Sequence, residues 1–141
     1  MKTFYVGIKG VVRDKARGFL LLKREYKSGD FWDSPGGRIE GNDDFETTLR
    51  RELAEELPGI SDVKIGELLG AHRVPKDIDG EVSLVLLYFL VEAVLPAEIE
   101  LSDEHSGHIW INTAGDIPEG LNPAIMGILD KFLAQPLQKS I

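Results

Sequence analysis

The feature that most constrains the fold of this chain is a helical pattern of apolar and acidic residues near its centre. Four apolar residues recur at intervals of four, as one face of an α-helix requires: Phe45, Leu49, Leu53 and Leu57. Asp43 is a suitable N-cap, and Glu46 follows three residues later, as in a capping box. Pro58 and Gly59 end the pattern. We therefore predict one amphipathic helix over residues 43–57.

The segments on either side of this helix have the patterns of strands. Apolar or alternating runs predict strands over residues 4–12, 19–23, 31–32, 63–74, 81–94 and 108–111. Residues 13–18 and 75–80 are polar turns or loops, and the glycines of 34–37 should break regular structure. Residues 122–133 close the chain as a second amphipathic helix. Strands before and after a central helix predict an α/β fold with a mixed sheet, and residues 1–141 are expected to form a single domain.

Composition narrows the classes of function. The net charge is −8, from 24 acidic and 16 basic residues, which argues against binding to nucleic acid. A small phosphorylated ligand stays compatible, because a divalent cation can carry the attraction. With no cysteine, the chain has neither disulfides nor a thiolate metal site. No apolar run is long enough to cross a bilayer, and the first residues lack a signal-peptide pattern, so we expect a cytoplasmic protein without a membrane partner.

The predicted helix carries carboxylates on the side that faces the protein. Measured from the first apolar residue on a helical wheel, Glu56 lies at about 20°, Glu52 at about −20° and Glu55 at about −80°. Loss of water destabilises a charged carboxylate strongly unless something compensates it, and a divalent cation is a natural compensator. The alternative is a solvated acidic helix, in which Arg50 and Arg51 form surface ion pairs.

A longer pattern around the helix matches a known signature. Gly37 is followed by Asp43 and then by residues 51–56 (RELAEE), and residues 34–40 (SPGGRIE) precede it. Together these segments resemble the signature of the Nudix hydrolase family, in particular its MutT-like members. The resemblance implies the Nudix fold, a mixed central β-sheet with helices packed on both faces. Two departures stand out: Asp43 replaces the family's glutamate, and Pro58 adds one residue before the terminal glycine.

The resemblance implies a role for each residue of the signature. Magnesium or manganese would be bound by carboxylates of the helix and by one carbonyl oxygen, from Glu52, Glu55, Glu56 and Gly36. Arg51 would orient these carboxylates. Arg38 would contact a phosphate of the substrate or remain a surface arginine. Asp43 is one methylene shorter than the family's residue, which puts its own role as a ligand or loop support in doubt.

Hydrolysis also needs a base that accepts a proton from water. In the nucleotide-sanitising branch of the family, a catalytic or metal-binding glutamate precedes a strand tryptophan, and Glu104 stands at a similar interval before Trp110. The alternative for Glu104 is an ordinary acidic loop. His105 is a rival base, although a lone loop histidine is usually solvated. Glu55, Glu104 and His105 therefore all stay open as the general base.

Three further positions could contact a nucleotide. Arg24 resembles an arginine that meets phosphate or base in the same branch. Asn122 could read a purine edge or cap the last helix, and we favour the cap because asparagine is a preferred capping residue. Phe31 and Trp32 could stack on a base, although large aromatic side chains more often belong to a core.

These patterns lead to a magnesium-dependent hydrolase that splits a nucleoside diphosphate linked to another group, X. A house-cleaning nucleoside triphosphate pyrophosphohydrolase is the leading hypothesis. A sugar-nucleotide hydrolase or a dinucleoside polyphosphate hydrolase is the alternative within the same chemistry. A Nudix-like ligand-sensing domain without hydrolysis and a plain protein-interaction domain are the alternatives outside it. The partner would be a small nucleotide, and the apolar strand ends permit a homodimer.

Overall fold

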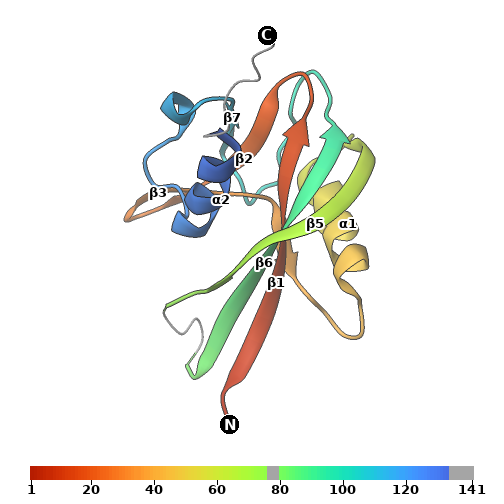
Figure 1. Cartoon of the computed structure of the whole chain (residues 1–141). Coiled ribbons are helices and arrows are strands. Elements are labelled where there is room, and N and C mark those ends of the chain that lie inside the picture. The colour runs from red at the N-terminus through yellow and green to blue at the C-terminus, as the bar shows by residue number, and fades with distance from the viewer. Residues whose placement is uncertain (76–79, 134–141) are drawn as a thin grey trace.

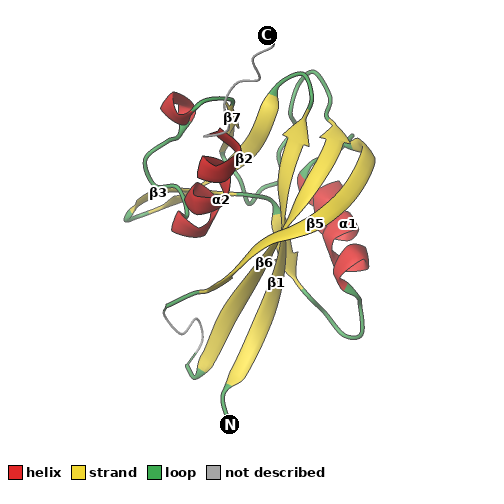
Figure 2. Cartoon of the chain, in the orientation of Figure 1, coloured by secondary structure: helices red, strands yellow, loops and turns green. Residues whose placement is uncertain are grey.

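The computed structural model describes residues 1–75 and 80–133, which form a mixed sheet flanked by helices (Figures 1 and 2). The loop predicted at 75–80 therefore lies mostly outside the described residues. The first strands lie before the central helix: β1 (Thr3–Asp14), β2 (Gly18–Tyr26), β3 (Gly29–Asp33) and β4 (Gly36–Arg38). The remaining elements are α1 (Phe45–Glu56), β5 (Ser61–Arg73), β6 (Val82–Val94), β7 (Gly107–Ile111), the short 3-10 helix η1 (Ala114–Asp116) and α2 (Pro123–Leu133). The predicted α/β fold with a mixed sheet is confirmed.

The sheet has seven strands and divides at β1. Its main path runs β3-β2-β1-β6-β5, with β1 and β6 parallel and the other neighbours antiparallel. Only the end of β1, at Val12–Asp14, pairs with β2, whereas its middle, at Gly7–Lys9, pairs with β4. The strand β2 therefore leaves β1 early and carries β3 and β7 with it. This divergence opens space between the two halves of the sheet.

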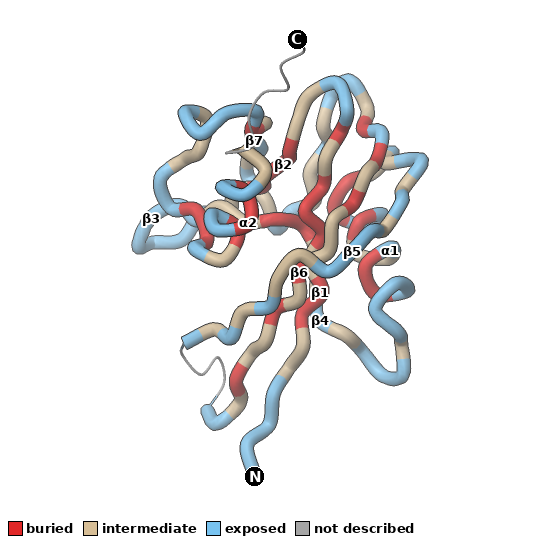
Figure 3. The backbone as a smooth tube through the Cα atoms, viewed as in Figure 1, coloured by how far each residue is buried: buried red, intermediate tan, exposed pale blue. Residues whose placement is uncertain are grey.

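Alternation along the strands gives the sheet two apolar faces, each covered by one helix. One face packs against α1 through a cluster that joins Ile8 and Val91 to Leu49 and Leu53. The other face packs against α2 through residues such as Val11, Tyr88, Ile125 and Leu129. Buried segments gather near the helices, and the N-terminal end of β1 is exposed (Figure 3). Helices on both faces of the sheet were predicted from the resemblance, and this is confirmed.

The start of α1 differs from the prediction. The N-cap is Asp44, whose side chain accepts a hydrogen bond of 2.7 Å from the Thr47 backbone N–H. Asp43, the predicted cap, instead forms an ion pair with Arg51. Asp43 and Asp44 are both residues that can cap a helix, and the ion pair of Asp43 with Arg51 leaves Asp44 as the cap. Phe45 is 47% exposed, although its ring packs 6.0 Å from that of Phe89.

Residues 34–37 were predicted to break regular structure, and this was wrong for Gly36 and Gly37. They lie in β4, which is antiparallel to β1, with Gly36 opposite Lys9. Gly36 has a φ of 150°, and a Cβ there would lie 2.1 Å from the carbonyl oxygen of Ile8. Glycine is required because the two backbones approach so closely, so the residue expected to interrupt a strand makes this strand possible.

Candidate active site

Glu56 is a charged residue in the core, at the last position of α1. The residue is 5% exposed, since Leu53 and Leu57 on either side draw this face of the helix inward. The inward orientation predicted from the helical wheel is confirmed for this residue. Burial raises the pKa of Glu56 to about 7, although the charge of Lys9 and the Gly36 N–H, which donates a hydrogen bond of 3.1 Å, act against the shift. This carboxylate has an environment suited to a cation.

Glu52 lies one turn before Glu56 and rests against the β4 backbone. A Cβ at Gly37 would lie 1.7 Å from the Glu52 Oε1, so the glycine leaves room for this carboxylate. Burial raises the pKa of Glu52, and the charge of Glu55 and a hydrogen bond with its side chain raise it further. Glu55 itself is exposed. At this end of α1, Glu56 is therefore buried, Glu52 is half-buried and Glu55 is exposed.

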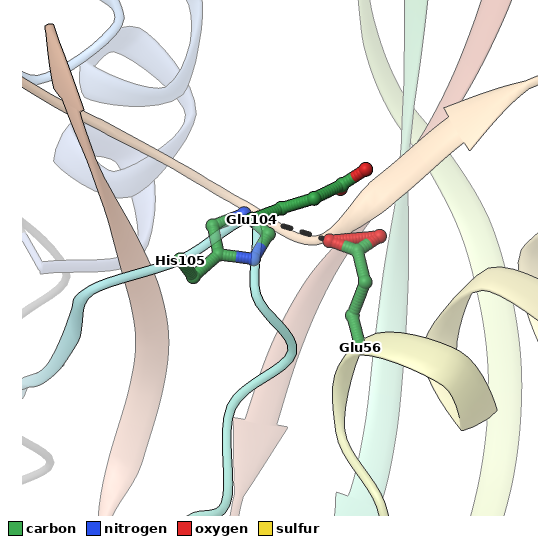
Figure 4. A group of neighbouring side chains, drawn as sticks. All are labelled: Glu56, Glu104 and His105. Carbon is green, nitrogen blue, oxygen red and sulfur yellow. Dashed lines mark ion pairs between the residues drawn. The ribbon is translucent and has the colours of Figure 1, made fainter.

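A loop before β7 brings two more groups to Glu56 (Figure 4). Ligand atoms of Glu56, Glu104 and His105 all lie within 4.8 Å of one another. The His105 Nε2 lies 3.6 Å from the Glu56 carboxylate, and the histidine side chain is only 9% exposed. The expectation of a solvated loop histidine was wrong, because the loop folds inward. Burial lowers the pKa of His105, and the charge of Arg24 lowers it further.

The donor set of this cluster fits a divalent cation. Several carboxylates and one imidazole converge, and the buried Glu56 has no arginine partner among the described residues. Oxygen donors of this kind suit magnesium or manganese, and the imidazole suits a transition metal. The structure brings Glu56, Glu104 and His105 together at this place, whereas Glu52, Glu55 and the Gly36 carbonyl stay predicted ligands.

Two basic residues border the cluster. Arg24 follows the buried residues of β2 and forms an ion pair of 3.2 Å with Glu104. Lys9 donates a hydrogen bond of 3.3 Å to the Ser34 carbonyl and lies 3.7 Å from the Asp33 carboxylate. Sequence reasoning missed Lys9. Its signal was a lysine inside an otherwise apolar strand segment, on the same face as Gly7 and Val11.

Arg51, expected to orient the metal-binding carboxylates, is tied to the loop before α1. It forms an ion pair with Asp43 and lies 3.8 Å from Glu40. These contacts raise the pKa of Arg51, with the hydrogen bond to Asp43 as the main cause and the charge of Glu52 as a smaller one. In the structure, Asp43 therefore acts as the partner of Arg51, and the pair fastens the loop to the helix.

Two cavities meet at the carboxylate cluster. The first has a volume of about 390 Å³ and includes Glu56 and His105, together with Phe31, Asp33, His72 and Asn122. The second is a groove of about 870 Å³ that includes Glu52 and Glu104, together with Tyr5, Arg38 and Glu40. Five residues line both: Lys9, Arg24, Gly36, Leu84 and Leu86. Leu84 and Leu86 also belong to the apolar cluster that packs against α2, so the two cavities lie at the edge of that cluster.

Asn122 caps α2, as favoured from its residue type. Its Oδ1 accepts a hydrogen bond of 2.9 Å from the Ala124 N–H. Its amide group donates to the Asp33 carboxylate at 3.2 Å and to the Tyr88 hydroxyl at 3.1 Å. Both amide hydrogens therefore have partners within the protein. Asp33, which sequence reasoning missed, is the acceptor that this network holds at the cavity.

The aromatic and arginine candidates take different positions. Phe31 is 36% exposed and lines the first cavity, so it is not a core residue as its size suggested. Trp32 is partly buried against the α2 cluster, with the Lys23 ammonium 5.9 Å from its ring centroid. Arg38 is exposed and stacks at 4.4 Å over the Tyr5 ring at the wall of the groove. Trp32 is thus a packing residue, whereas Phe31 and Arg38 are accessible to a ligand.

The comparisons with known proteins agree with this geometry. The Nudix domain family model matches residues 3–115, so the chain belongs to the Nudix family. It is a hydrolase acting on phosphoanhydride bonds, with the α/β fold of MutT-like proteins. The ligand-sensing and protein-interaction hypotheses are therefore not supported. Among the residues that the structure describes, no helix has the length and apolar character needed to span a membrane.

Three relatives illustrate the similarity. An 8-oxo-dGTP diphosphatase of Proteus vulgaris is 41% identical over 86 residues, which are 58% of this chain and 70% of the relative. A CTP pyrophosphohydrolase of Escherichia coli is 27% identical over 95% of this chain and 94% of its own. The crystal structure of a MutT protein from Methanosarcina mazei superposes with a TM-score of 0.74 at 21% identity, covering 93% of this chain and 94% of that one.

Proposed function

We propose that this protein hydrolyses nucleoside triphosphates to a nucleoside monophosphate and pyrophosphate, with magnesium or manganese as cofactor. The observation that carries the proposal is the place of the carboxylate cluster, where a small cavity joins an open groove. The nucleoside would occupy the cavity and the polyphosphate would occupy the groove, so the scissile bond would lie beside Glu52, Glu56 and Glu104. The names of the relatives, an 8-oxo-dGTP diphosphatase and a CTP pyrophosphohydrolase, support the same class of substrate.

Each side chain near the scissile bond has a proposed task. Glu52, Glu55, Glu56 and the Gly36 carbonyl would hold the cation. When bound, the cation neutralises the diphosphate and lowers the pKa of a water molecule. We propose Glu104 as the base that accepts a proton from that water, because it is exposed and faces the groove. Glu55 is the alternative base, and it too is exposed.

The basic residues would bind the phosphates. Arg24 pairs with Glu104, so substrate binding would shift this guanidinium from the carboxylate to a phosphate oxygen. Lys9 lines both cavities and lies between them. Arg38 would receive the terminal phosphates along the groove. Arg51 would keep its structural partners, Asp43 and Glu40, and would hold α1 in position.

Base recognition would fall to Asp33 more than to Asn122. The amide of Asn122 is committed to Asp33 and Tyr88, whereas a carboxylate has lone pairs left after these bonds. An acceptor at this place favours a base edge that carries N–H donors. Phe31 would stack on the base from the cavity rim. Asn122 then serves as the residue that orients Asp33.

A dinucleoside polyphosphate is the second candidate substrate. The groove of about 870 Å³ continues past the cluster to Tyr5 and Arg38, and this space exceeds what a terminal phosphate needs. A structural relative, an Ap4A hydrolase of C. elegans, is 27% identical with a TM-score of 0.65 over 91% of this chain and 96% of that one. A cytoplasmic location, a single domain and a homodimer remain predictions alongside either substrate.

The test is a panel of nucleotides with the purified chain and magnesium. We expect pyrophosphate release from nucleoside triphosphates, and a loss of about 100-fold or more in kcat for Glu56→Gln and Glu55→Gln. His108→Gln, at an exposed position of β7 outside the cluster, is the control and should keep full activity. Absence of turnover on every nucleotide, or full activity in both glutamine variants, would sink the proposal.

A further inference from the structure

The imidazole of His105 is buried in the carboxylate cluster with unused hydrogen-bonding capacity. Its side chain is 9% exposed, and Nε2 points toward Glu56 at 3.6 Å. Its Nδ1 is buried, and no hydrogen-bond partner for it lies among the residues that the structure describes. A buried nitrogen in this state costs free energy, so the ring does not lie here for stability alone.

The loop holds this ring in a fixed place. The His105 N–H donates a hydrogen bond of 3.1 Å to the Ser102 carbonyl, and the Ser106 N–H donates one of 2.9 Å to the Lys23 carbonyl in β2. Hydrogen bonds therefore hold the backbone of His105 and of Ser106, one within the loop and one to β2. Figure 4 shows its ring and the Glu104 carboxylate arriving from the loop, and Glu56 facing them from the end of α1.

We propose that His105 supplies a nitrogen ligand to a divalent cation held together with Glu56, and that this mixed donor set selects manganese and similar transition ions over magnesium. The inference rests on the metal dependence of the proposed function. Magnesium takes oxygen ligands and keeps its waters, whereas imidazole nitrogen suits transition metals. The His105 Nε2 already lies 3.6 Å from the Glu56 carboxylate, so small side-chain movements would place both around an ion, with the proposed base Glu104 within 4.8 Å of both.

The experiment uses the full chain with Mn²⁺ or Mg²⁺ alone and no nucleotide. Calorimetric titration measures both affinities, and pulsed EPR of bound Mn²⁺ detects coupling to a coordinating ¹⁴N nucleus. We expect tighter binding of Mn²⁺ than of Mg²⁺ and a clear ¹⁴N signal. His105→Gln should remove the signal and weaken Mn²⁺ by about tenfold or more, with little change for Mg²⁺. The matched control, His108→Gln, should change neither affinity.

Two results would overturn the inference. One is the absence of ¹⁴N coupling in the wild-type protein, a measurement that does not depend on whether any variant folds. The other is an equal loss of Mn²⁺ and Mg²⁺ affinity in His105→Gln, which would make His105 a support for Glu56 only. The nucleotide panel tests the proposed function separately. If the protein binds Mn²⁺ through nitrogen but hydrolyses no nucleotide, the inference about His105 stands and the proposed function is wrong.

Discussion

At the scale of single residues, the site depends on groups that are unfavourable by themselves. Glu56 is buried with a pKa raised to about 7, and Glu52 shares its surroundings with Glu55. A helix chosen for stability would carry apolar residues at these positions. The free energy lost here is offset by the apolar packing of Leu49 and Leu53 on the same helix.

Replacement of Glu56 by glutamine should stabilise the metal-free protein at alkaline pH. The folded protein holds a proton on Glu56 up to about pH 7, whereas the ordinary pKa of glutamate is 4.5. A carboxyl with a raised pKa favours folding below pH 4.5, and this contribution is lost as pH rises to about 7. Glutamine removes the loss and can still accept the Gly36 hydrogen bond.

Urea unfolding in the presence of EDTA checks this prediction. At pH 8 we expect Glu56→Gln to exceed the wild type by roughly 1–3 kcal/mol, and at pH 4.5 the two should converge. Added Mn²⁺ should reverse the order, because only the wild type gains stability from the ion. A variant that is less stable at every pH would contradict the raised pKa of Glu56.

Gly37→Ala tests the contact between β4 and Glu52. The added methyl group would lie 1.7 Å from the Glu52 Oε1, so the carboxylate must move. We expect a loss of about tenfold or more in activity while the fold stays intact, as a displaced catalytic group typically causes. Circular dichroism and steady-state kinetics measure the two effects. In Gly127→Ala, where nothing lies within 4 Å of the new Cβ, activity should be unchanged.

At the scale of elements, one carboxylate joins the end of the first hairpin to the end of β6. The Asp14 side chain accepts hydrogen bonds from the Ala16 N–H at 2.8 Å and from the Leu95 N–H at 3.2 Å. It also pairs with Arg17 at 3.1 Å, and Arg17 donates to the Leu95 carbonyl at 2.7 Å. Burial acts to raise the pKa of Asp14, but these contacts outweigh it and hold the pKa below the usual value.

Asp14→Ala should therefore destabilise the fold by about 2 kcal/mol, because it leaves the buried Leu95 N–H without a partner and removes the ion pair with Arg17. A lowered carboxyl pKa contributes stability above the ordinary value of 3.8, and this is lost as pH falls below it. The gap between wild type and variant should accordingly narrow in acid, as thermal unfolding across pH would show. Glu46→Ala, which breaks an exposed pair with Arg50, should cost less than about 0.5 kcal/mol.

The helix and the strands were predictable because their patterns are local. The spacing of Leu49, Leu53 and Glu56 fixes which side of α1 faces inward, whatever it packs against. The pairing of β4 with β1 was not predictable, since it depends on the fit of Gly36 against the Ile8 carbonyl. The same limit applies to His105, because no pattern within its loop indicates that the loop folds inward.

At the scale of the whole molecule, the proposed function assigns base recognition to the first cavity and phosphate binding to the groove that joins it. Phe31→Ala should raise KM for nucleoside triphosphates about tenfold with little change in kcat, since base stacking contributes roughly 1–3 kcal/mol. Arg38→Ala should lower kcat/KM for all nucleotides by a similar factor. Initial rates on a purine and a pyrimidine triphosphate measure both effects.

Phe4→Ala is the matched control for this pair. Phe4 is an exposed aromatic residue, at 42%, and it lines neither cavity. Its loss should leave KM and kcat unchanged. Equal effects of Phe31→Ala and Arg38→Ala on every kinetic constant would show that the two cavities do not act separately.

The parallel pairing of β1 with β6 has a consequence for how the protein is made. Thr3 pairs with Val82, and Arg13 pairs with Glu92, so β1 can complete its pairing only with a strand that lies far along the chain. Pairing of this kind is slow, because a long loop must close before any contact between β1 and β6 forms. During synthesis, a nascent chain that ends before β6 has no completed sheet on which α1 can pack. We therefore expect ribosome-bound fragments that lack β6 to be digested readily by protease, and resistance to appear only after residue 94 has left the exit tunnel.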